Sequence, residues 1–354
     1  MNDTVSEKPL RVAVIGVGRM GQHHARVYSQ IPGCKLAAIC DANQAAAEKM
    51  AALYNCPAFT DINEMVRTLT GANKLDAATI ATPTVYHLAL AQTLLNAGID
   101  VLVEKPLAPN VAEARAIVDL AQQRGRILQV GHTERFNPAF RALKPYQLSP
   151  QFVEVHRISP MTFRSIDVGV VLDLMIHDID IVQHLVGRPV TEVSAVGVSV
   201  IGDHEDIANA RLTFANGCIA NLTASRLALK SERKMRLFSP NAYVTVDYHR
   251  KSGAIITRTA NEEQLERVRQ QVREGQVADL MQLNYPELVK YEDLKVTDIE
   301  PLRAEQDSFL NAVRTRGTPE VTGEDGFVAV DIAARIVKCI QEHKWESMPA
   351  VLTR

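Results

Sequence analysis

The sequence predicts two joined domains, an α/β domain built on a doubly wound parallel sheet and an α+β domain built on a largely antiparallel open sheet. Its 354 residues are enough for about two domains of ordinary size. In the first third, short apolar runs alternate with helical patterns, which is typical of parallel strands joined by helices. After about residue 150, apolar runs follow one another with turn signals between them, which indicates antiparallel strands. We therefore expect the first domain over residues 1–131 and the second over residues 132–354, with closing helices able to pack back on the first domain.

The elements of the first domain follow from the spacing of apolar residues. The first run is rich in β-branched residues, and helical spacing follows it directly. The same alternation recurs down the domain, with strands expected at residues 11–16, 35–40, 75–81, 99–103 and 127–130, and helices at 20–31, 44–53, 85–96 and 111–124. Because crossovers between parallel strands are right-handed, such a series winds helices onto both faces of one sheet.

The second domain begins with a helix and continues as a run of strands. We expect helices at 172–186, 261–274, 302–315 and 326–341, and strands at 190–201, 208–214, 218–225, 234–238, 243–248 and 254–257. The many charged residues of the helix at 261–274 indicate a surface insertion. Helices cover only one face of such a sheet, so its other face is either solvated or buried against another subunit. We therefore expect isologous pairing into a homodimer or a homotetramer.

Composition excludes several classes of partner. The 39 Lys and Arg residues nearly balance the 41 Asp and Glu residues, which excludes a non-specific nucleic-acid binder. No apolar run approaches the roughly 18 residues of a membrane span, so no membrane partner is expected. The five cysteines are scattered without a C-x-x-C pair, and no His, Asp and Cys cluster has metal-ligand geometry. We therefore expect no metal and, as the default, a reducing cytoplasm.

A G-x-G-x-x-G motif spans residues 16–21, between the first strand and the first helix. Gly16 allows the tight turn, Gly18 lets the backbone approach a pyrophosphate, and Gly21 permits close packing of helix on strand. The amino end of the helix then offers free N–H groups to the anion. This context predicts a dinucleotide-binding Rossmann domain, with the cofactor held by Gly16, Gly18, Arg19, Met20 and Gly21. The alternative is a glycine-rich turn without a ligand.

Asp41 closes the second strand, 20 residues after Gly21. An acid in this place accepts hydrogen bonds from the adenosine ribose and repels a 2′-phosphate. No arginine follows within residues 42–44, so we expect NAD rather than NADP. Asp41 can also serve as the N-cap of the next helix, and the two roles are compatible.

Further motifs give the chain a resemblance to a known family. Ala81-Thr82-Pro83 ends one strand, His87 lies beyond it, and Glu104-Lys105-Pro106 ends the next. Together with residues 131–138 and the Asp173-x-x-x-His177 pair, these motifs resemble the Gfo/Idh/MocA family of NAD(P)-dependent sugar and polyol oxidoreductases over almost the whole chain. The resemblance adds to the cofactor site Thr82, Pro83, His87, Glu104 and Lys105.

The same resemblance implies the catalytic residues, which are Lys105, Asp173 and His177. His177 is expected to take a proton from a secondary alcohol, and Lys105 to stabilise the developing alkoxide. Asp173, four residues before His177, is expected on the same helix face, where it would orient the substrate or the imidazole. The alternatives are that His177 has a structural role, and that Asp173 is one of several acidic residues on the helix without a role in catalysis.

Residues 133–138 and 166–180 resemble a subgroup acting on nucleotide sugars, the UDP-N-acetylglucosamine 3-dehydrogenases. This implies oxidation of the 3-hydroxyl of a UDP-N-acetylhexosamine to a 3-keto sugar. A diphosphate needs cations, and the candidates are Arg135, Arg157, Arg164 and Arg226. Asn137 is a candidate for a sugar hydroxyl or the acetamido group, and Lys105, Asp173 and His177 complete the substrate site. Surface or inter-subunit ion pairs are the alternative for the arginines.

Three other functions stay open on the sequence. A free sugar or an inositol is the nearest alternative substrate, and retained NAD could serve glycoside cleavage. A non-catalytic NAD-binding regulator is the third alternative, which an intact Lys105, Asp173 and His177 disfavour. The carbon oxidised, the direction of the reaction and the release of NAD are not determined by the sequence.

Overall fold

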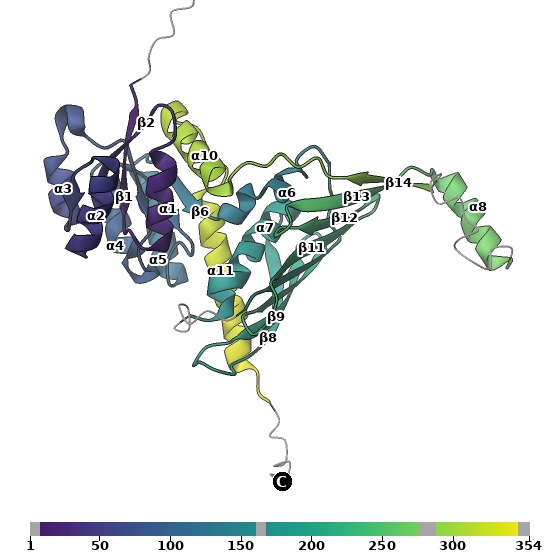
Figure 1. Ribbon diagram of the computed structural model, residues 1–354. Helices are drawn as coiled ribbons and strands as arrows, with labels where there is room; N and C mark the ends of the chain where they lie inside the picture. The colour runs from purple at the N-terminus through teal and green to yellow at the C-terminus, as the bar shows by residue number, and fades with distance from the viewer. Residues whose placement is uncertain (1–7, 161–167, 276–287, 346–354) are drawn as a thin grey trace, which may run out of the picture.

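The computed structural model describes residues 8–160, 168–275 and 288–345 (Figure 1). It contains two sheets, one of six strands in the order β3-β2-β1-β4-β5-β6 and one of eight in the order β14-β13-β12-β11-β7-β10-β9-β8. The long helix α11 (Gly323–Glu342) lies between them and contacts both. No helix of the described residues is long and apolar enough to cross a membrane.

All strand pairs of the first sheet are parallel, as expected. The strands are β1 (Leu10–Ile15), β2 (Cys34–Cys40), β3 (Ala58–Phe59), β4 (Ala77–Ile80), β5 (Asp100–Glu104) and β6 (Leu128–Gly131). The helices that join them are α1 (Arg19–Tyr28), α2 (Gln44–Tyr54), α3 (Ile62–Thr68), α4 (His87–Asn96) and α5 (Val111–Gln123). Sequence reasoning missed β3 and α3, because a strand of two residues carries no apolar run. The carboxyl ends of the strands meet at one edge, where ligands bind in such sheets.

The second sheet is antiparallel except at one position. Its strands are β7 (Phe152–Ile158), β8 (Val190–Val198), β9 (Ile207–Phe214), β10 (Ile219–Ser225), β11 (Glu232–Ser239), β12 (Ala242–Asp247), β13 (Ser252–Arg258) and β14 (Val289–Asp293). β7 and β10 pair in parallel, because the chain crosses a helix and two strands before it returns beside β7. Sequence reasoning missed β7, in which Glu154, His156 and Arg157 interrupt the apolar residues, and β14.

Helices cover the inner face of the second sheet. The helix expected at 172–186 is present, but it begins with a π-helical turn, η5 (Val171–Met175), before α7 (Ile176–Val186). α10 (Pro301–Thr315) packs on α1 and shares a buried apolar cluster with β1 of the first sheet. The charged helix α8 (Glu262–Arg273) has no buried residue and projects away from the body (Figure 1). A short η3 (Thr133–Phe136) and α6 (Pro138–Arg141) follow β6.

Candidate active site

The glycine-rich turn joins β1 to α1. Gly16 has a φ of +84°, and a Cβ there would lie 2.7 Å from the carbonyl oxygen of Ala81. A Cβ at Gly21 would lie 1.8 Å from the carbonyl oxygen of Gly16, so the turn packs directly on the helix. Gly18 is the N-cap of α1, and no atom of the described residues lies within 4 Å of the position its Cβ would take. The turn therefore leaves the first amides of α1 open to an anion, and it fits a dinucleotide pyrophosphate.

A cleft of about 560 Å³ opens beside this turn. It is lined by five of the cofactor residues that the sequence predicted: Gly16, Gly18, Asp41, Thr82 and Pro83. Sequence reasoning missed other lining residues, among them Asp61, Ile62, Tyr86 and Leu90. No pattern marks these positions, because α3 and the loop before α4 reach the cleft only through the fold. Arg19 and Met20 are exposed at the start of α1.

The Asp41 carboxylate holds the glycine-rich turn. One oxygen accepts a hydrogen bond of 2.7 Å from the backbone N–H of Val17, and the other accepts one of 2.8 Å from the N–H of Asn43. Asn43, rather than Asp41, is the N-cap of α2. The carboxylate faces the cofactor cleft, where contact with a ribose hydroxyl stays a prediction.

Lys105 follows β5 and reaches the second domain. Its Nζ donates a hydrogen bond of 2.7 Å to the backbone carbonyl of Asp173 and lies 3.5 Å from the Asp173 carboxylate. His87 braces the same loop, because its buried ring lies within hydrogen-bond distance of the carbonyls of Thr82, Pro106 and Leu107. The fold therefore brings together two of the three expected catalytic side chains, which are 68 residues apart.

His177 lies in the first turn of α7, four residues after Asp173 of the π-helical turn. Burial in the first place, and then the charge of Lys105, hold the pKa of His177 well below its usual value. A neutral imidazole is the state that a general base requires. The buried ring of His132 stands edge-on to that of His177, with 6.4 Å between centroids, and has no hydrogen-bond partner for either ring nitrogen among the described residues.

Glu104 is buried behind Lys105 rather than in the cofactor cleft. It accepts hydrogen bonds from the backbone N–H of Lys105 at 3.2 Å and pairs with His24 at 2.7 Å. Glu305 of α10 lies in the same cluster and accepts a hydrogen bond from the Thr133 hydroxyl at 3.0 Å. Burial, and then the Glu104 charge, raise the pKa of Glu305 well above its usual value. This cluster ties α1, β5 and α10 together beside Lys105.

Two of the arginines expected to bind phosphate form buried ion pairs with α7. Arg135 pairs with Asp180, with a hydrogen bond of 2.8 Å from Nε. Arg157 pairs with Asp178 through two hydrogen bonds of 2.8 and 2.7 Å. All four side chains are buried. A buried guanidinium needs a carboxylate partner, so these two residues hold α7 in place, and the structure does not support their contact with a substrate phosphate.

Two further candidates for substrate binding, Arg226 and Asn137, also form hydrogen bonds within the protein. Arg226 is buried, pairs with Asp206 at 2.7 Å and donates a hydrogen bond of 2.6 Å to the carbonyl of Val168. Asn137 caps α6 and donates a hydrogen bond of 3.2 Å to the carbonyl of Tyr248. The polar groups of both side chains therefore bind other parts of the protein, which supports a structural role for each. Arg164 lies outside the described residues.

Glu205, which sequence reasoning missed, anchors the π-helical turn that precedes α7. Its side chain accepts a hydrogen bond of 3.2 Å from the N–H of Val171, and its backbone carbonyl accepts one of 3.0 Å from the N–H of Val170. Glu205 lies in the connection between β8 and β9, which carries no motif. The residue therefore holds the π-helical turn that presents Asp173.

Comparisons with known proteins agree with this geometry. The model of an oxidoreductase family with an NAD-binding Rossmann fold matches residues 10–132, and that of the GFO/IDH/MocA C-terminal domain matches residues 151–245. The UDP-N-acetylglucosamine 3-dehydrogenase of Acidithiobacillus ferrooxidans is 37% identical over 255 residues, which cover 70% of this chain and 79% of that protein. An inositol 2-dehydrogenase of Rhizobium meliloti is 24% identical over 95% of this chain and 98% of its own length.

Solved structures show the same arrangement of domains. The A. ferrooxidans UDP-N-acetylglucosamine 3-dehydrogenase superposes with a TM-score of 0.81 at 31% identity, covering 94% of this chain and 98% of that one. A levoglucosan dehydrogenase in complex with NADH and levoglucosan superposes with a TM-score of 0.78 at 19% identity, covering 94% of this chain and 98% of that one, which shows the fold alone. The chain belongs to the Gfo/Idh/MocA family and is an NAD-dependent oxidoreductase that acts on CH–OH groups.

Proposed function

We propose that this protein oxidises the 3-hydroxyl of a UDP-N-acetylhexosamine, UDP-N-acetylglucosamine first of all, to the 3-keto sugar. The observation that carries the proposal is the meeting of Lys105 with Asp173, beside His177, at the edge of the sheet that also forms the cofactor cleft. The likeness to a UDP-N-acetylglucosamine 3-dehydrogenase supports the choice of substrate.

His177 would accept the proton of the sugar hydroxyl, since its lowered pKa keeps the imidazole neutral. Lys105 would donate a hydrogen bond to the same oxygen and stabilise the negative charge that develops on it. Its present acceptor, the carbonyl of Asp173, marks where the substrate oxygen would compete. Asp173 would orient the sugar ring through its carboxylate. Bound NAD supplies the acceptor for the hydride that leaves the carbon.

The test is an absorbance assay for NADH with the full chain, NAD and UDP-N-acetylglucosamine, with a carbonyl trap to draw off the ketone. Free N-acetylglucosamine and myo-inositol run in parallel. We expect NADH with the UDP-sugar and little with either free compound. NADH from myo-inositol alone would overturn the choice of substrate, and no NADH from the UDP-sugar, with none released on denaturation, would overturn the proposed reaction.

An inositol is the second candidate substrate. The inositol 2-dehydrogenase of R. meliloti aligns over 95% of this chain, whereas the more similar UDP-sugar enzyme aligns over 70%. The assay above distinguishes the two, because an inositol carries no diphosphate and needs no cation to hold one.

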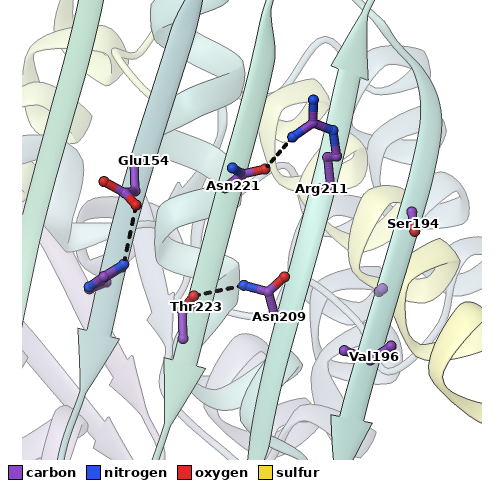
Figure 2. A pocket seen from close by; sticks show the side chains of 9 residues that line it. Glu154, Ser194, Val196, Asn209, Arg211, Asn221 and Thr223 are labelled. Carbon is purple, nitrogen blue, oxygen red and sulfur yellow. Dashed lines mark hydrogen bonds and ion pairs between the residues drawn. The ribbon is translucent and has the colours of Figure 1, made fainter.

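We also propose that the outer face of the second sheet pairs with a second copy of the chain. Figure 2 shows side chains standing on this face over neighbouring strands, with a hydrogen bond between Arg211 and Asn221 and another between Asn209 and Thr223. No described helix covers the face. Apolar side chains are exposed on it, among them Val196, Val198, Ile207 and Phe238. Such a face suits an isologous interface, and the pairing would give a homodimer or, with a second interface, a homotetramer.

A further inference from the structure

His132 follows β6 directly, at the edge of the first sheet where Lys105 follows β5. The parallel register pairs Gly131 of β6 with Glu104 of β5, so His132 and Lys105 leave neighbouring strands side by side. The ring of His132 stands edge-on to that of His177, with 6.4 Å between centroids. His132 therefore lies among the residues expected to carry out the reaction, and the proposed function gives it no role.

The ring nitrogens of His132 have no hydrogen-bond partner in the part of the chain that the structure describes, although the residue is only 1% exposed. Two other buried histidines differ in this respect. His24 lies within hydrogen-bond distance of Glu104 and Gln306, and His87 of three backbone carbonyls. A buried polar group without a partner costs stability, and a functional role is one explanation of such a cost. The contrast favours a role in function for His132.

Nδ1 of His177 also lacks a partner. A neutral imidazole carries one proton, so a base that takes a proton at Nε2 must carry its own at Nδ1. Nδ1 of His177 is buried without a hydrogen-bond partner among residues 8–160, 168–275 and 288–345. The charged and titratable groups that act on this ring are Lys105, Arg157, His132 and Arg233. The lysine and the arginines are cations without a lone pair, so His132 is the member of this set that can accept the Nδ1 proton.

We propose that His132 is a positioning residue for His177, and that a ring nitrogen of His132 accepts a hydrogen bond from Nδ1–H of His177 when the substrate is bound. The bond would fix the tautomer that leaves Nε2 free to take the proton of the sugar hydroxyl. It would also stabilise the imidazolium that forms. The inference rests on the proposed function in one respect, the role of His177 as the base, and it applies to any alcohol that the protein oxidises.

The two rings must approach each other before this bond forms. A hydrogen bond needs about 3 Å between the nitrogens, and catalytic hydrogen bonds that are long without substrate often tighten when it binds. The backbone of His132 is fixed, because its N–H bonds to the carbonyl of Val130 at 2.8 Å and its carbonyl to the N–H of Arg135 at 2.9 Å. The approach therefore requires ring rotation and a shift of the turn before α7. Lys105 now contacts the carbonyl of Asp173 in that turn, and a substrate oxygen would replace this contact.

The charge state of both rings suits the proposed bond. Burial is the largest cause that lowers the pKa of His132, and it does the same for His177. Besides His177, the charged groups around His132 are Asp180, Arg135, Lys105 and Asp325. A neutral His132 keeps a lone pair for the hydrogen bond and adds no charge that would repel a protonated His177.

The experiment compares His132→Phe with wild type in steady-state kinetics of the full chain, with NAD and the alcohol that is oxidised in the assay above. Phenylalanine keeps a ring and removes both nitrogens. We expect kcat to fall about tenfold, the value of one hydrogen bond to a charged group. The KM for NAD should stay unchanged. The Tm without substrate should be equal or higher, because two unpaired buried nitrogens are removed.

Two further variants give the rescue and the control. His132→Gln should recover most of the rate, since its amide oxygen can accept the same N–H. His184→Phe is the matched control, because His184 lies on the same helix as His177 but is exposed, with its ring against Phe140. It should turn over like wild type. A His132→Phe variant that loses both Tm and kcat, with no recovery in His132→Gln, would show a structural role and overturn the inference.

A double variant separates positioning from an independent catalytic role. Because His132 acts through His177, His132→Phe combined with His177→Ala should be no slower than His177→Ala alone. A further loss in the double variant would overturn the inference. Wild-type kcat in His132→Phe, with slow turnover in His177→Ala, would overturn the inference and leave the proposed base standing. Wild-type turnover in His177→Ala would overturn the proposed base, and the role of His132 with it.

Discussion

The Nζ of Lys105 donates a hydrogen bond of 2.7 Å to the backbone carbonyl of Asp173, and this contact joins the carboxyl end of β5 to the π-helical turn before α7. A strand end in one domain and a helix start in the other therefore share one site. π-Helical turns within helices are frequent at functional sites, and here the turn carries Asp173 four residues before His177.

Lys105→Ala should lower turnover about 10²- to 10³-fold, the usual effect of removing a donor to a developing oxyanion. The affinity for NAD should change little, because the phosphate-binding turn and the cleft beside it are built from other residues. Steady-state kinetics and NAD titration measure the two effects. Lys290→Ala, at an exposed lysine on β14, is the control. Wild-type turnover in Lys105→Ala would refute its role.

Asp41→Ala should weaken NAD binding and relax the discrimination against NADP, since a carboxylate at this edge of the cleft repels a 2′-phosphate. The ratio of kcat/KM for NAD and NADP measures the change. Asp61 also lines the cleft, so the double variant Asp41→Ala with Asp61→Asn should accept NADP better than the single variant. An NAD/NADP ratio that stays constant in both variants would contradict the assignment of Asp41 to the ribose.

Glu205→Ala should lower kcat by about tenfold while the KM for NAD stays constant, because the hydrogen bond of the Glu205 side chain to Val171 would be lost and the Asp173 turn would loosen. Glu205→Gln should restore most of the rate, since an amide oxygen can accept the same N–H. Kinetics of the two variants side by side measure this. Equal losses in both would show that charge, rather than the hydrogen bond, is what Glu205 contributes.

Glu305→Gln should stabilise the protein more as the pH rises. The folded-state pKa of Glu305 is raised, so its neutral form is favoured on folding and the wild type loses stability once the pH exceeds the unfolded value of about 4.3. Glutamine stays neutral, and the gain should reach about 1.4 kcal/mol for each unit by which the pKa is raised. The charged and titratable groups around Glu305 are Glu104, His24 and Tyr28.

Thermal unfolding at pH 4 and at pH 8 measures this gain. Glu305→Ala is the control, and it should be less stable than wild type at both pH values because it removes the contact with Thr133 and leaves a cavity. A Tm difference between Glu305→Gln and wild type that does not depend on pH would show that Glu305 is ionised in the folded protein.

The chain should sediment as a dimer or a tetramer of its 39.0 kDa subunit. Phe238→Asp, on the outer face of the second sheet, should shift it toward the monomer, because a charge would be buried in the interface. Leu53→Asp, at an exposed position of α2 in the first domain, should leave the assembly unchanged. A wild-type monomer at micromolar concentration would remove the proposed interface.

Local patterns predict most of the fold because they report on burial within one element. Apolar runs between helical spacings predict the parallel sheet, and the motif at residues 16–21 predicts the turn that Gly16 and Gly21 close. The sequence did not predict β3, β7 and β14. β3 has only two residues, and about half of the residues of β7 and β14 are polar, so these segments become strands only because they pair with a neighbouring strand. The parallel pairing of β7 with β10 is likewise a property of the whole chain path.

The sequence by itself determined the family motifs and the candidates for catalysis, Lys105, Asp173 and His177, because these depend on residue type and short spacing. Only the tertiary structure decided which arginines are available to a substrate. Arg157 and Arg233 stand opposite each other on paired strands, yet Arg157 is buried in an ion pair with Asp178, whereas the Arg233 side chain is 40% exposed. The reason is physical: burial and partner choice arise from contacts between residues far apart in the chain, and charge is available to a ligand only where those contacts leave it exposed.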